Sequence, residues 1–340
     1  MTDLSDSRIF SISKAADAFL QSVSQARSLN TARTYKNAMQ AFLGMLHSRK
    51  IDPESLDITK ISEDSIAWMA TYLKDHAPTT ERLYLTAIAR FFEYLAAENL
   101  ASVNLPRVRL LIQQRARRPG IRLPQFPKDA IEKVLDYVVN RVKAAPENEN
   151  DHLRVLRDRA FLITLADTGL RVHEACNLRR GDIDWNEGRA LVTGKGDRQA
   201  VVRFSKRCQL ALKDYLSARS SLDGNTGRPL GSLPLFARHD KGAGKKIKAI
   251  TPTTGRNIVS ERVRESLGAE AVGTITPHSF RHYFVTRVLQ ASGNLKLAQE
   301  LARHRSIAVT QRYAHLSDNE LDQGYYEIFE ESANDDFAPH

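Results

Sequence analysis

The stretch ADTGLRVHEACNLRRGDIDW, residues 166–185, contains a helix end, a helix start and the beginning of a strand. Gly169 follows the helical pattern of residues 153–167 and suits the left-handed conformation that ends helices. The residues DIDW then begin a strand, and RALVTG and RQAVVRF flank the turn GKGD as a hairpin does. We therefore expect an α+β domain with a small antiparallel sheet.

The remaining segments of the chain are predominantly helical. On the carboxyl side of residue 127, helices are expected at 128–143, 206–219, 252–267, 277–291 and 295–302, with a last one in the tail. In the first third, Tyr35, Met39 and Phe42 recur at three- to four-residue spacing, as do Ile88, Phe91 and Leu95 in a second segment. With 12–27 and 62–75, these segments predict a four-helix domain, so the fold class is mainly α.

Residues 106–127, PRVRLLIQQRARRPGIRLPQFP, contain four prolines and six arginines without a sustained period. Such a composition is typical of an extended basic linker. We expect a helical domain over 1–112, a linker over 113–127, a second domain over 128–316 and a tail over 317–340.

Composition narrows the class of protein. The 340 residues are 42% apolar, enough for a sizeable core, and contain only Cys176 and Cys208, too few for a disulfide scaffold. No apolar run approaches the roughly 20 residues that span a bilayer, and the first residues do not form a signal peptide. We expect a cytoplasmic protein.

Charge is distributed unevenly along the chain. The formal net charge is +10 overall and +18 for residues 1–312, because the last 28 residues hold eight carboxylates and no Lys or Arg. A basic body of this kind favours a polyanionic partner such as DNA. Outward-facing Arg33, Lys36, Arg82 and Arg90 are candidates for phosphate contacts, and the alternative is a solvated helix face.

The segment TPHSFRHYFVTRVL, residues 276–289, predicts a helix capped by Thr276. His278 and Arg281 then lie on one face at its positive end, where a phosphate would bind. An exposed capping pair is the alternative. A zinc helix using His278 and His282 is disfavoured, because Ser279 stands where the general-base glutamate of HExxH belongs.

Two further cations are candidates for a phosphate site. Arg171 lies three residues before Glu174, whose carboxylate would brace it for bidentate binding. Lys195 lies between two glycines at the hairpin tip, from where it could donate a proton. A structural ion pair and a solvated lysine are the respective alternatives.

The stretch RHRSIAVTQRYAH, residues 303–315, supplies a histidine and a tyrosine. The candidate set in chain order is Arg171, Lys195, His278, Arg281, His304 and Tyr313. Arginines can neutralise a phosphodiester while a tyrosine displaces an alkoxide to form a covalent phosphotyrosine. This chemistry requires neither metal nor nucleotide, and the sequence has no P-loop and no Asp-rich cluster.

The motifs TGLRVHEACNLRRGDIDW, VTGKGDRQAVV, TPHSFRHYFVT and LARHRSIAVTQRYAH occur in this order. Together they resemble those of the tyrosine recombinases of the phage integrase family, in the simple two-domain form. The resemblance covers residues 128–316, which would be the catalytic domain, while residues 12–100 are similar to the family's core-binding domain in pattern alone.

The resemblance implies a site-specific DNA recombinase. Tyr313 would attack the scissile phosphate and become joined to the DNA 3′ end, releasing a 5′-hydroxyl, with Arg171 and Arg281 clamping the phosphate. Strand exchange would need no metal and no ATP, because the phosphotyrosyl bond retains the energy of the ester.

The resemblance also assigns the other polar residues. His304 would hydrogen-bond the phosphate, Lys195 would protonate the leaving oxygen, His278 would act as a base near the tyrosine, and Glu174 would steady Arg171. One departure concerns Arg303, where the family usually has glycine.

In this family four protomers assemble on two DNA duplexes, and each passes a C-terminal helix to its neighbour. The tail of this chain has an apolar face suited to that docking, formed by Leu321, Tyr325, Ile328 and Phe329; packing on its own domain is the alternative. A type IB topoisomerase and a non-catalytic DNA-binding regulator are the competing functions. The sequence leaves open the target site and the choice among integration, excision and resolution of cointegrates or dimers.

Overall fold

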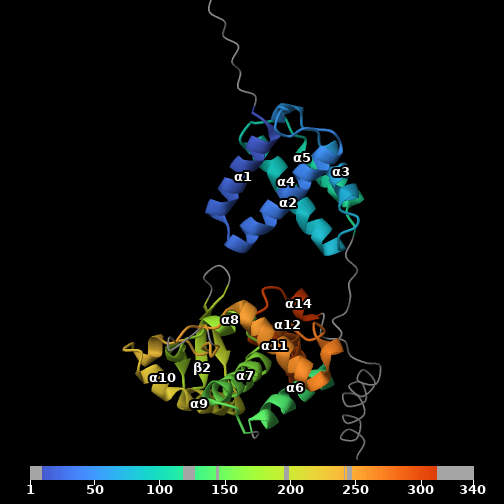
Figure 1. Cartoon of the computed structure of the whole chain (residues 1–340). Coiled ribbons are helices and arrows are strands. Elements are labelled where there is room, and N and C mark those ends of the chain that lie inside the picture. Colours follow the sequence, from blue (N-terminus) through green and yellow to red (C-terminus); the bar gives the residue numbers. More distant parts are fainter. Residues whose placement is uncertain are drawn as a thin grey trace, which may run out of the picture. The chain divides into compact units, whose positions relative to one another are not determined.

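The computed structural model describes residues 10–117, 127–142, 145–194, 199–240, 242 and 247–311. The chain folds as two compact units, residues 1–121 and 122–340, and each is described by itself (Figure 1). Within the described ranges, no helix has both the length and the apolar character that crossing a bilayer requires.

The N-terminal unit is helical. Ser11 and Ser28 cap its first two helices by accepting backbone N–H groups of Lys14 and Thr31. Aromatic rings, among them Phe42, Phe91 and Phe92, fill its core. The four predicted helices are present as α1 (Ile12–Ala26), α2 (Leu29–Ser48), α3 (Asp64–Tyr72) and α4 (Pro78–Ala97), and α5 (Leu105–Arg115) follows them.

The prediction of extended chain from Pro106 onward is wrong for the first half of that segment, because α5 occupies it. Asn104 caps this helix by accepting the Arg107 N–H at 3.0 Å. Pro106 lies in the first turn, where its missing N–H costs no helical hydrogen bond. Val108 is buried against the helical core. Residues 118–126 lie outside the described chain.

The second unit is built around α7 (Glu149–Thr168), which is buried on most of its circumference. Its helices besides α7 are α6 (Lys128–Arg141), α8 (Val172–Asn177), α9 (Lys206–Ala218), α10 (Ser220–Gly224), α11 (Pro252–Leu267), α12 (Pro277–Ser292), α13 (Leu295–Ala302) and α14 (Ile307–Gln311). Helix α7 packs against the helices α6, α8, α9 and α12. The predicted long helices are confirmed, whereas the short α10 and α14 were not predicted.

A three-stranded antiparallel sheet in the order β1-β2-β3 packs into the same core. Its strands are β1 (Ile183–Asp184), β2 (Arg189–Thr193) and β3 (Gln199–Arg203). Ala190 pairs with Val202, and both face the core. The predicted fold class, mainly α with a small antiparallel sheet, is confirmed.

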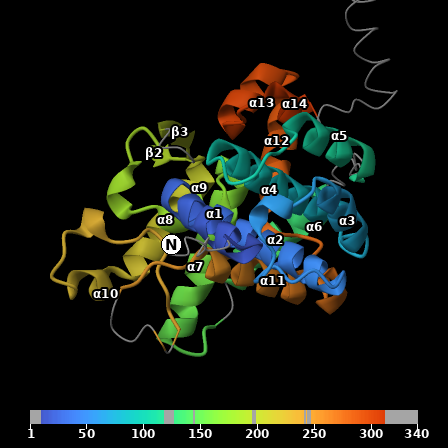
Figure 2. The same cartoon turned by 90° about the horizontal axis from the view of Figure 1, so that it is seen from above.

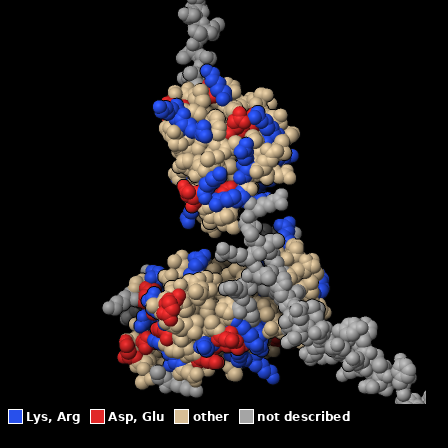
Figure 3. All heavy atoms as spheres, turned by 90° about the vertical axis from the view of Figure 1, so that its right-hand side faces the viewer, with Lys and Arg blue, Asp and Glu red and all other residues tan. Residues whose placement is uncertain are grey.

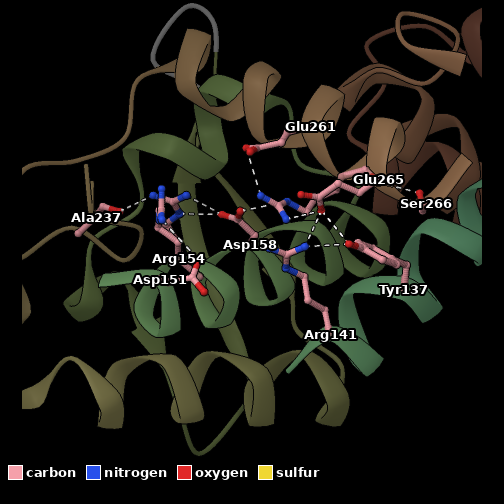
Figure 4. Close-up of polar contacts among 11 residues, drawn as sticks. Tyr137, Arg141, Asp151, Arg154, Asp158, Ala237, Glu261, Glu265 and Ser266 are labelled. Carbon is pink, nitrogen blue, oxygen red and sulfur yellow. Dashed lines mark hydrogen bonds and ion pairs between the residues drawn. The ribbon is translucent and has the colours of Figure 1, made fainter. Parts of the chain in front are cut away.

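A buried ion network ties α6, α7 and α11 together (Figure 4). The Asp158 carboxylate lies 2.7 Å from Arg157 Nη2 and 3.3 Å from Arg262 Nε. Glu265 Oε2 lies 2.5 Å from Arg262 Nη1 and 3.0 Å from Arg141 Nη1. Burial raises the pKa of Asp158 even though two arginines flank it.

Candidate active site

The first part of the site is the turn between α7 and α8. Gly169 ends α7 with φ +59°, and a Cβ there would lie 2.5 Å from the Phe284 ring. Arg171 is the N-cap residue that precedes α8, and its backbone N–H and Nη1 each donate to the Glu174 carboxylate at 2.9 Å. The Glu174 side chain is 2% exposed and that of Arg171 is 44% exposed. Arg171 is therefore braced from within and open to solvent.

The second part is the start of α12. Thr276 precedes it, and Ser279 Oγ accepts the Thr276 N–H at 3.1 Å. One and a half turns into the helix, Arg281 is 3% exposed and donates to the carbonyl oxygens of Gly169 and Ala302. Arg281 therefore joins the end of α7 to the end of α13.

The third part is the end of α13. Arg303 has φ +56° and ψ +45°, the left-handed conformation, and its N–H donates to Glu300 O at 3.0 Å. This turn directs His304 toward α14, where its Nδ1 lies 2.9 Å from Thr310 Oγ1. Helices α12, α13 and α14 lie side by side (Figure 2).

The guanidinium of Arg303 enters the site from the same turn. Its Nη2 lies 3.2 Å from Glu174 Oε2 and 3.4 Å from Gly169 O, and the side chain is 11% exposed. In the sequence, Arg303 stands out only as a departure from the family pattern. Its contribution was missed because it depends on two chain segments more than 120 residues apart.

The electrostatics of the site favour an anion. Burial, then the charges of Arg281 and Arg171, lower the pKa of His304 to about 4, and the same causes in the same order lower the pKa of His278. Burial alone would raise the pKa of Glu174, but Arg303 and Arg171 hold it below its ordinary value. At neutral pH the histidines are uncharged and the arginines give the site an excess of positive charge.

The structure therefore brings together five of the predicted residues, Arg171, Glu174, His278, Arg281 and His304. Lys195, Tyr313 and the tail 317–340 lie outside the described residues. Besides Arg303, two contributors were not assigned a role there from sequence: Thr310, which contacts His304, and His282, whose ring lies 4.3 Å from that of His278. Among the residues that the structure describes, no three His, Cys, Asp or Glu side chains form a group that could hold a metal ion.

The four candidate DNA contacts are exposed on two helices of the N-terminal unit. Arg33 and Lys36 lie on α2, and Arg82 and Arg90 on α4. Arg90 also forms an ion pair with Glu93. Lys and Arg side chains are spread over the face of this unit seen in Figure 3.

Comparison with known proteins places the chain among relatives. Residues 134–320 match the phage integrase family, and residues 16–99 match the N-terminal SAM-like domain of phage integrases. The tyrosine recombinase XerC of Thermodesulfovibrio yellowstonii is 30% identical over 303 residues, which cover 88% of this chain and 89% of the relative. The XerC of Bifidobacterium longum subsp. infantis is 28% identical, with 92% and 96% covered.

A solved structure shares the fold. The XerH site-specific recombinase bound to palindromic difH substrate aligns with a TM-score of 0.67 at 20% identity, covering 93% of this chain and 84% of that one. The family match extends over more than half of the chain and includes every segment that forms the site. The chain belongs to the phage integrase family and is a tyrosine recombinase.

Proposed function

We propose that this chain is a site-specific DNA recombinase that cuts and rejoins double-stranded DNA through a covalent 3′-phosphotyrosine. The observation that carries the proposal is the convergence of Arg171, Arg281 and His304 around one anion-binding site, with Glu174 bracing Arg171. The relatives named tyrosine recombinase, and the XerH complex with its DNA substrate, support it.

Tyr313 is the proposed nucleophile. Its phenolic oxygen forms a bond to the scissile phosphorus as the bond to the 5′ oxygen breaks, and Lys195 gives that oxygen a proton. Attack by the 5′-hydroxyl of a second strand then reverses the chemistry and releases the tyrosine. The number of phosphoester bonds is unchanged, so no nucleotide hydrolysis is needed.

The described residues supply the charge stabilisation. Two arginines whose guanidinium groups are held by fixed partners neutralise the non-bridging oxygens without reorganising during the reaction. His304 is neutral at pH 7, so with Nδ1 accepting from Thr310 its Nε2–H can donate to the phosphate. His278 is also neutral and would accept the proton of the tyrosine.

The remaining assignments concern DNA and assembly. Arg33, Lys36, Arg82 and Arg90 would bind DNA phosphates. Four protomers on two duplexes would be joined by the acidic tail 317–340, whose charge complements the basic body. The predicted linker over 113–127, whose first residues belong to α5, would connect the two units.

The test is covalent capture. The full chain is incubated with a pool of nicked duplexes of randomised sequence, in which cleavage releases a short strand and prevents religation, and the adducts are sequenced to give a defined probe. Wild type should form an adduct with that probe, and Tyr313→Phe should bind it without forming one. Cleavage without sequence preference, with relaxation of any supercoiled plasmid, would indicate a topoisomerase instead.

A further inference from the structure

We propose that Arg303 is a positioning residue that couples the two phosphate-binding arginines to each other. The inference rests on the proposed function, because it assigns a role in the same cleavage step. Arg303 touches neither the tyrosine nor the substrate in this account; it acts through the groups that hold Arg171 and Arg281.

The link to Arg171 is the Glu174 carboxylate. Arg171 donates its backbone N–H to Oε2 and its Nη1 to Oε1, both at 2.9 Å, and Arg303 Nη2 reaches Oε2 at 3.2 Å. With its side chain 2% exposed, Glu174 has little water to stabilise its charge. Arg303 thus keeps Glu174 ionised and fixed, and a fixed carboxylate fixes the orientation of Arg171.

The link to Arg281 is the Gly169 carbonyl and the adjoining peptide. Gly169 O accepts from Arg281 Nη1 and from Arg303 Nη2 at 3.4 Å. Arg281 Nη2 also donates to Ala302 O, on the peptide bond that leads directly into Arg303. Arg303 is therefore bonded, directly or through one shared group, to the supports of both clamping arginines.

The backbone at this position argues against a passive side chain. Residue 303 adopts φ +56°, which glycine accepts freely and a residue with a Cβ adopts at a cost. If the turn were the only requirement, glycine would be the favoured residue. A buried guanidinium that satisfies Glu174 and Gly169 is a physical reason for arginine to be present instead.

Three substitutions separate the side-chain role from the backbone role. Arg303→Gly relieves the backbone and removes the guanidinium, Arg303→Ala keeps the Cβ and removes the charge, and Arg303→Lys keeps both the Cβ and a positive charge. Arg287→Ala is the matched control. Arg287 lies on the same helix as Arg281, is exposed, and forms an ion pair with Glu132 at 3.4 Å.

The readout is the single-turnover rate of adduct formation on the DNA probe recovered by covalent capture, at saturating protein, beside the dissociation constant for the same DNA. Arg303→Gly and Arg303→Ala should cleave roughly 10- to 100-fold more slowly, because a misplaced clamp lowers the rate without loss of binding. Affinity should change by less than about threefold, since most phosphate contacts remain. Arg303→Lys should recover part of the rate, and Arg287→Ala should match wild type.

Rates are normalised to the fraction of protein that binds DNA, so loss of folding does not mimic the effect. Wild-type cleavage by Arg303→Gly, or equal rates for Arg303→Lys and Arg303→Ala, would overturn the inference while leaving the proposed function intact. Failure of the wild-type chain itself to form an adduct with any sequence of the pool would instead overturn the proposed function.

Discussion

Two of the groups in the second unit that place a buried carboxylate between two arginines differ in their access to solvent. In one, Asp158 lies between Arg157 and Arg262, and both arginine side chains are 7% exposed (Figure 4). In the other, Glu174 lies between Arg171, which is 44% exposed, and Arg303. The two groups contain the same types of residue, but only the second includes an arginine, Arg171, that is open to solvent.

The difference in access distinguishes Arg171 from the two arginines around Asp158. Around Asp158, the arginines contact protein groups such as Ala237 O and Glu265, and burial raises the pKa of the carboxyl group. Around Glu174, the pKa of the carboxyl group is lowered, so the carboxylate stays charged while one arginine remains open to solvent. An arginine braced in this way can accept an anion at little cost in reorganisation.

The largest expected effect is on stability, at the buried group around Asp158. Asp158→Ala leaves Arg157 and Arg262 buried without the carboxylate between them, and should lower the free energy of unfolding by about 3–5 kcal/mol. Denaturant unfolding measures it. Glu261→Ala removes an exposed partner of the same Arg262 and should cost under about 1 kcal/mol. Equal losses would show that burial is not what distinguishes the network.

A substitution in the group around Glu174 should instead affect cleavage strongly and stability only slightly. Arg171→Ala should slow covalent cleavage by about 100- to 1000-fold, the usual effect of removing one donor to a developing charge. The free energy of unfolding should fall by less than about 1 kcal/mol, because Arg303 still pairs with Glu174. Single-turnover cleavage and unfolding on the same sample check both values, and a variant that unfolds easily but cleaves normally would reverse the comparison.

The buried surroundings of Arg157 also predict a pH dependence of stability, through the neighbouring His239. His239 is buried and lies 2.8 Å from Tyr215 Oη; burial, then the charges of Arg157 and Arg219, lower its pKa to about 3. The unfolded chain, with a pKa of about 6.5, binds this proton first, so the contribution is complete above pH 6.5 and is lost as the pH falls toward 3. Denaturant unfolding at pH 7 and pH 5 measures this effect. Between these two pH values, the free energy of unfolding of His239→Gln should fall by about 2 kcal/mol less than that of wild type.

The smallest expected effect extends the comparison to the N-terminal unit. Lys36→Ala should reduce the slope of log affinity against log salt by about 0.9, as expected for one phosphate contact. Arg90→Ala should change the slope less, because Arg90 already pairs with Glu93. Titrations of DNA binding over a range of salt concentrations measure both slopes, and an unchanged slope for Lys36→Ala would remove this residue from the interface.

Much of this arrangement could be predicted from sequence, and the failures have physical reasons. The long helices follow from apolar periodicity, and Arg171 and Arg281 from their places beside Gly169 and Pro277. Helix α5 is not evident from the sequence, because Pro106 ends the apolar pattern and only the structure shows that it lies in the first turn of a helix. The contacts of Arg303 could not be predicted, because they depend on the tertiary packing of α13 against the end of α7.

Arg171, Arg281 and His304 are proposed to hold a DNA phosphate for attack by Tyr313. Peptide mapping of the trapped protein–DNA adduct by mass spectrometry tests this proposal most directly. We expect a nucleotide 3′-phosphate on Tyr313 in the wild-type chain, and a yield of adduct at least about 100-fold lower in Arg171→Ala. A phosphate on any other residue, or an adduct of undiminished yield in that variant, would contradict it.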